Sequence, residues 1–189
     1  MMNKICIFLI ILCTCLCSSC KSKKTVYDNS TKETIFKYRI KYLTYSDETI
    51  YSFKHYKFGV NYGAINQAVV TKEAWVLRYC AVRSLGSVDR VKERDSWYLT
   101  ERESLLAIPP NMKNSDKKDL KNNLDSLFET YDKLYNDVET LNDYIENSEY
   151  LEDEDLSHVT TLKNAIDKGI ELFNKYNDNI ISKLNSCLK

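Results

Sequence analysis

A run of carboxylates beside one of only two histidines is the part of the chain best suited to chemistry. Its acidic connector, from Asn147 to Asp155, reads NSEYLEDED, and His158 follows closely. Asp153, Asp155 and His158 could together form a weak divalent-cation site, because carboxylates and imidazole are common metal ligands. The connector lacks the Gly and the alternating spacing of calcium loops, so a solvated acidic loop is the simpler interpretation.

No other pattern in the chain indicates catalysis or a bound cofactor. There is no HExxH, no CxxC after the first twenty residues and no EF-hand loop. A glycine-rich phosphate loop and a GxSxG elbow are also missing from the sequence. We therefore expect no catalytic residues, no resident metal and no cofactor.

The cysteines are distributed unevenly, with five of the seven at or before Cys20. The other two, Cys80 and Cys187, could form a disulfide in an oxidising compartment, but two positions do not establish a pairing. The alternatives are a buried, apolar Cys80 and a thiol close to the chain terminus at Cys187.

The first twenty-four residues have the layout of an export signal. Lys4 precedes an apolar run over 5–16, small and sulfur-containing residues follow, and the chain then becomes basic at Lys21, Lys23 and Lys24. This order is typical of a secretory signal peptide. The apolar run is too short to span a bilayer, which takes about 20 apolar residues.

The exit of this segment resembles the signal of a bacterial lipoprotein, in which the cysteine after the cut is diacylated. Cys20 fits best because Ser18 and Ser19 precede it, although Cys17 stands where the common pattern has Leu. Cys15 is a second choice, and an uncleaved anchor or an ordinary secretory signal are the alternatives. The resemblance implies a lipid-anchored protein of the bacterial envelope, on the periplasmic face or the cell surface.

Removal of residues 1–19 leaves 170 residues, enough for one domain. We expect a short basic tether over 20–29 and a single helical domain over 30–189. The formal net charge of zero hides an asymmetry, because 21–110 has 16 Lys+Arg against 10 Asp+Glu, whereas 111–189 has 10 against 17. The basic charges are scattered between aromatics, so we expect the halves to attract each other and predict no nucleic-acid partner.

With only four Gly and two Pro, the composition favours helices over a sandwich with several hairpins. The second half predicts a helix over 116–147, capped by Asn114-Ser115, and a second helix to nearly the C-terminus. Steps of three and four residues give each helix an apolar seam. The seams are Leu120, Leu124, Leu127, Tyr131, Leu134, Val138, Leu141 and Ile145, and Val159, Leu162, Ile166, Ile170, Phe173, Tyr176, Ile180 and Leu184.

These two helices should form an antiparallel hairpin, and Gly169 inside the second one predicts a close helix contact. In the first half, alternation near 36–42 suggests a strand, but the uninterrupted stretch Thr31 to Lys57 is too long for one, so a helix is expected. Further helices are predicted from Thr71 to Leu85 and from Ser87 to Ala107. The fold class is therefore an all-α bundle of about five helices.

Aromatic residues are concentrated in the first half of the domain. Such a face could bind glycans, peptides or proteins, but we interpret the rings as core, with their hydroxyls reaching its edge. Trp75 and Trp97 are expected to be core as well. The cluster comprises Tyr38, Tyr42, Tyr45, Tyr51, Phe53, Tyr56, Phe58 and Tyr62.

Four residues around the predicted hairpin resemble a family signature. Tyr144-Ile145, then Tyr150 and Asp153, with a long amphipathic helix after them, look like the YiiG-like bacterial lipoproteins, although Ile145 replaces the second aromatic. The resemblance covers roughly Ser115 to Leu188. It implies an all-helical envelope protein and brings no activity or catalytic residue.

The function we expect is that of a non-enzymatic binding or structural module, held on a membrane by its N-terminal lipid and contacting an unknown protein partner. The alternative is a small-ligand or cation binder, or an enzyme, with its site near the connector 147–158.

Overall fold

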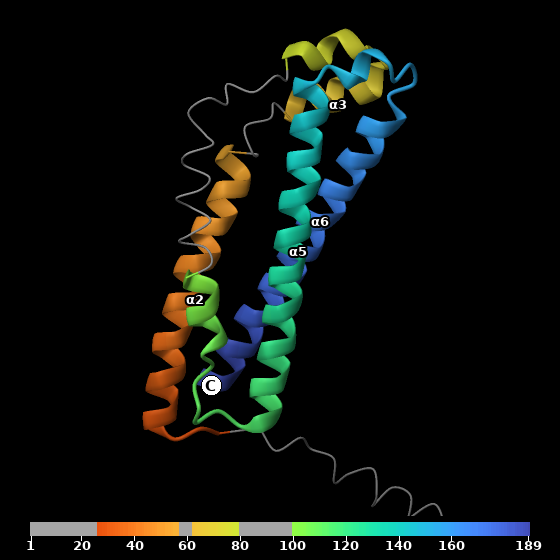
Figure 1. Cartoon of the computed structure of the whole chain (residues 1–189). Coiled ribbons are helices and arrows are strands. Elements are labelled where there is room, and N and C mark those ends of the chain that lie inside the picture. The colour runs from red at the N-terminus through yellow and green to blue at the C-terminus, as the bar shows by residue number, and fades with distance from the viewer. Residues whose placement is uncertain (1–25, 57–61, 80–99) are drawn as a thin grey trace, which may run out of the picture.

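Two long antiparallel helices, α5 (Asn114–Glu146) and α6 (Ser157–Leu188), run along the whole bundle (Figure 1). The computed structural model describes residues 26–56, 62–79 and 100–189. The hairpin confirms the predicted pairing, and the one-turn 3₁₀ helix η3 (Glu149–Leu151) lies in its connection. These described residues are helical apart from short connections and contain no strand, which confirms the all-α class.

The predicted seams face each other inside this hairpin. Every predicted seam residue of α5 is buried, together with Phe128 and Tyr144. On α6, five of the eight are buried, whereas Leu162, Ile170 and Tyr176 are half-buried. Burial of these apolar faces is the main source of stability for helices of this kind.

The N-cap predicted for α5, Asn114-Ser115, is wrong by one to two residues. Lys113 occupies the N-cap and makes no side-chain capping bond, while Asn114 and Ser115 are already helical. Asp116 does lie in the first turn, as expected from the helix dipole. The N-cap of α6 is Leu156, whose backbone is left-handed with φ of 55°.

In the described residues, four helical segments precede the hairpin. The helix α2 (Asn29–Tyr56) confirms helix over strand in the ambiguous aromatic stretch. The helix α3 (Tyr62–Thr71) and the 3₁₀ helix η2 (Ala74–Tyr79) follow it. Residues 100–106 form a helical end that stops before Pro109, as predicted, and the rest of that predicted helix lies outside the described residues.

The helix predicted to begin at Thr71 is wrong in this region. Thr71 ends α3, because the next residue, Lys72, is left-handed with φ of 59°. The tighter 3₁₀ turn that follows buries Val76 and Leu77 and leaves Trp75 half exposed. Trp75 is therefore not core, and Trp97 lies outside the described residues.

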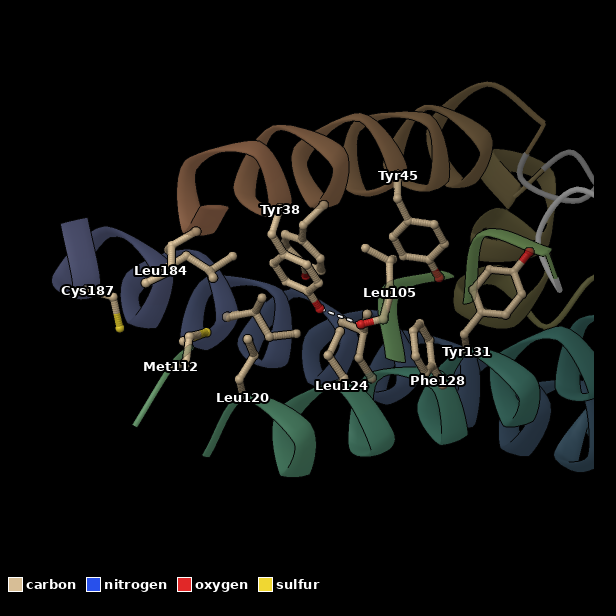
Figure 2. Close-up of a cluster of buried hydrophobic side chains, with 14 of the residues drawn as sticks. Tyr38, Tyr45, Leu105, Met112, Leu120, Leu124, Phe128, Tyr131, Leu184 and Cys187 are labelled. Carbon is tan, nitrogen blue, oxygen red and sulfur yellow. Dashed lines mark hydrogen bonds between the residues drawn. The ribbon is translucent and has the colours of Figure 1, made fainter. Parts of the chain in front are cut away.

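Two buried clusters lie one after the other along the hairpin. In the first, α2 and residues 105–112 pack on the halves of α5 and α6 that lie beside them (Figure 2). In the second, α3 and η2 pack on the other halves. None of the helices in the described ranges has the length and apolar composition needed to cross a bilayer.

The aromatic residues of α2 belong to the first cluster. Tyr38, Tyr42 and Tyr45 are buried, which confirms the core interpretation for these three. Their hydroxyls do not all reach the edge, because the Tyr42 hydroxyl donates to buried Asn177 Oδ1 at 2.7 Å. The Tyr38 hydroxyl donates to the carbonyl of Leu105, as Figure 2 shows. The structure does not describe the side chains of the other five aromatic residues of the cluster predicted from the sequence.

Gly169 lies where α6 approaches Leu134 of α5, which confirms the predicted close contact. A Cβ at Gly169 would stand 3.0 Å from Cδ1 of Leu134, tighter than ordinary contact. An added methyl group must therefore displace a buried leucine, although Ala is otherwise the better helix former.

We predict that the effect of Gly169→Ala depends on Leu134. Helix propensity favours Ala over Gly by about 1 kcal/mol, and the contact with Leu134 should cancel part of this gain in the native chain. In a Leu134→Ala background the full gain should appear. Urea unfolding of the parent chain, the two single variants and the double variant measures the effect of Gly169→Ala on the free energy of unfolding. An equal effect with and without Leu134→Ala would contradict the close contact.

Candidate functional site

The acidic connector folds around Asp153, which caps the start of α6. The Asp153 carboxylate accepts hydrogen bonds from the backbone N–H of Ser157 at 3.1 Å and of His158 at 3.0 Å. The hydroxyl of Tyr144, on the last turns of α5, donates to the same carboxylate at 2.7 Å. Asp155 also accepts from the N–H of Ser157, at 3.0 Å. These bonds satisfy N–H groups that would otherwise lack partners at a helix start.

The electrostatics of this corner follow from those hydrogen bonds. Partial burial acts to raise the pKa of Asp153, but the bonds from Tyr144, His158 and Ser157 outweigh it and hold that pKa below its ordinary value. Burial, together with the bond to Asp153, raises the pKa of the Tyr144 hydroxyl. At neutral pH the corner therefore pairs a carboxylate with a neutral phenol.

The predicted cation site falls in this corner. The structure brings Asp153, Asp155 and His158 into one turn, with the His158 ring 5.0 Å from the Tyr144 ring between centroids. The two carboxylates face the N–H groups of α6. Across the described ranges, no group of three or more His, Cys, Asp or Glu residues is arranged to hold a metal ion.

The cysteine predictions are only partly covered by the structure. Cys187 is a buried free thiol, and burial raises its pKa. Cys20 and Cys80 lie outside the described residues. Lipidation at Cys20 therefore stays a prediction. The free thiol of Cys187 does not support the Cys80–Cys187 disulfide.

A second Tyr–Asp pair, which the sequence reasoning missed, ties three helices together at the opposite end. The Tyr27 hydroxyl donates to Asp116 in the first turn of α5 and accepts from the N–H of Lys113 at 3.0 Å. Lys183, in the last turns of α6, lies 3.3 Å from Asp116 and 2.8 Å from Asp119. We call this end of the bundle the Tyr27 end. The sequence signal for it was the three-residue spacing of Asp116 and Asp119, which places both on one face of α5.

These contacts set the charge state of the Tyr27 end. Partial burial acts to raise the pKa of Asp116, but the bonds from Tyr27 and Lys183 hold it below its ordinary value. The two Asp residues in turn raise the pKa of Lys183. The ion pair is therefore fully charged at neutral pH.

A buried polar contact between α2 and α6 was also missed. Oδ1 of Asn177 accepts from the Tyr42 hydroxyl and from the Ser46 hydroxyl, at 2.7 and 2.8 Å. The predicted seam placed Tyr176 inward, whereas the structure buries Asn177 and leaves Tyr176 half-buried. This contact orients α2 on the hairpin, because a misplaced α2 would leave three buried polar groups unpaired.

Exposed apolar side chains gather on the elements at the end opposite Tyr27. Val70 on α3 is 80% exposed, Trp75 on η2 is 51% exposed and Leu151 on η3 is 69% exposed. These elements pack together at the top of Figure 1, and Lys72 Nζ donates to the carbonyl of Asp155 at 3.1 Å. We call this the connector end, and the three apolar residues the connector surface. Between residues 143 and 155 it carries seven Asp or Glu and no Lys or Arg.

No family model, curated protein or solved structure matches the chain. The resemblance to YiiG-like lipoproteins therefore stays a prediction. In the structure, its residues Tyr144 and Asp153 are joined by a hydrogen bond, and Tyr150 is buried beside them in the second cluster.

We predict that the capping role of Asp153 makes stability depend on pH. Asp153→Ala should lower the free energy of unfolding at neutral pH by about 1 kcal/mol, the usual cost of losing an N-terminal cap. Because the folded pKa is lowered, this stabilisation is present above the unfolded pKa of about 3.9 and is lost as pH falls through the folded pKa.

Urea unfolding from neutral to acidic pH measures this difference, and it should shrink toward zero in acid. Glu154→Ala is the matched control, since Glu154 is exposed and adjacent in the same acidic run. Equal effects of the two substitutions, or a difference that persists in acid, would contradict the capping role.

Proposed function

We propose that the chain is a lipid-anchored protein of the bacterial envelope whose helical bundle acts as a non-enzymatic binding module. The predicted lipid at Cys20 supplies the membrane attachment, and the connector surface supplies the contact with a partner protein. The YiiG-like resemblance agrees with a helical envelope protein.

The observation that carries this proposal is the separation of the two ends. The described chain starts at Val26, at the Tyr27 end, and the connector end lies at the far tip of the hairpin (Figure 1). With 33 residues in α5, the two ends are about 50 Å apart. A lipid near the Tyr27 end would leave the connector surface facing away from the membrane.

The chemistry of the connector surface indicates its partner. Tryptophan is enriched where proteins bind each other, and the half-exposed Trp75 lies on η2, which contacts both α3 with Val70 and η3 with Leu151. The surrounding acidic residues favour a protein that presents a basic rim around an apolar contact. Such an interface should weaken at high salt.

Lipidation is the first testable part. We predict that mass spectrometry of the mature protein finds a diacylglyceryl group on Cys20 and that Cys20→Ser releases the protein from the membrane fraction. Cys15→Ser is the control and should leave the anchor intact. An unmodified Cys20 in the mature protein would contradict the anchor.

The binding surface is tested by photo-crosslinking in intact cells, with the cross-linker beside Trp75. We predict a defined crosslinked protein that disappears with Leu151→Asp or Val70→Asp and persists with Phe36→Asp. Phe36 is the matched control because it is 51% exposed, as Trp75 is, and lies on α2 in the other half of the bundle.

Circular dichroism must show the same helix content for all variants. A crosslink that survives both connector-surface substitutions, or that is lost equally with Phe36→Asp, would contradict a partner site at the connector end.

A further inference from the structure

The two ends of the bundle carry opposite charge. Seven acidic residues and no basic ones lie between 143 and 155 at the connector end. At the Tyr27 end, residues 28–33, 113–119 and 183–189 carry six Lys against four Asp or Glu. The long axis of the bundle is therefore also an axis of charge.

Several basic side chains at the Tyr27 end are exposed. Lys113 and Lys118 are exposed near the start of α5, and Lys189 is exposed beyond the end of α6. Lys32, near the start of α2, donates to the carbonyl of Lys189 at 3.4 Å, and Lys183 of α6 pairs with Asp116 in the first turn of α5, so the three helix ends lie together. Val26, which is 71% exposed, adds an apolar side chain at the same end.

From these observations we infer that the Tyr27 end docks on an anionic lipid bilayer and holds the bundle upright on it. The inference rests on the proposed lipid anchor for its geometry. Five residues separate Cys20 from Val26, so the two lie at most about 20 Å apart. The basic end thus stays within reach of the headgroups.

Charge then selects the orientation. A negatively charged membrane surface attracts Lys side chains within about one Debye length, which is about 8 Å at physiological salt. The acidic connector end, about 50 Å from the Tyr27 end, lies beyond that range when the bundle is upright. A bundle lying on its side would instead bring the seven acidic residues toward the surface, which repels them.

The test uses the mature chain, residues 20–189, with Cys20→Ser so that no acyl chain contributes. The two buried clusters begin at Tyr27 and at Ile65, so the residues 20–189 include every residue of both clusters. We expect it to sediment with phosphatidylcholine vesicles that contain phosphatidylglycerol and not with phosphatidylcholine alone, and high salt should abolish the binding. No binding to the anionic vesicles would overturn the inference.

A pair of double variants locates the contact. Lys113→Gln with Lys118→Gln should weaken the partition coefficient by roughly fivefold for each Lys removed. Lys168→Gln with Lys175→Gln removes the same charge from exposed positions within α6 and should leave binding close to that of the parent chain. An equal loss in both variants would overturn a specific basic end.

Lysine acetylation read by mass spectrometry gives the orientation. On anionic vesicles, Lys113 and Lys118 should be protected, while Lys168 and Lys175 should react as they do in solution. Protection of the α6 lysines would mean that the bundle lies flat and would overturn the upright docking. Because the assay needs no lipidation, its result is independent of the mass-spectrometric test of Cys20.

Discussion

The packing of α5 against α6 determines where the shorter helices of the bundle lie. One apolar seam runs the whole length of each helix, and the two seams bury each other. The shorter segments are arranged by this hairpin, since α2 packs on one half and α3 with η2 on the other. An unbroken seam of this length also keeps the two ends of the bundle far apart, which gives them separate chemical environments.

Both long helices begin in the same way, with an aspartate that accepts a hydrogen bond from a tyrosine hydroxyl. Asp116 in the first turn of α5 accepts from Tyr27, and Asp153 before α6 accepts from Tyr144. A negative charge at a helix N-terminus is favourable because the helix dipole is positive there. Each pair also joins the helix start to a different segment of the chain, so helix initiation and tertiary packing are stabilised by the same contacts.

Much of the fold could be predicted from the sequence because the seams of α5 and α6 repeat without interruption, and Gly169 was correctly placed at a close contact. The prediction failed where local chemistry overrides periodicity. A left-handed Lys72 ends α3 where a new helix was expected to begin, and this exposes Trp75. The candidate site was harder, because Tyr144, which donates to Asp153, lies on α5 and no spacing in the sequence shows that pairing.

We propose that the bundle stands on end, with its basic Tyr27 end at the membrane and its acidic connector end away from it. Neutron reflectometry of the lipidated protein on a supported bilayer containing phosphatidylglycerol measures this orientation. An upright bundle should give a protein layer about 50 Å thick above the headgroups, the length of α5. A layer only about 20 Å thick, the width of two packed helices, would contradict it.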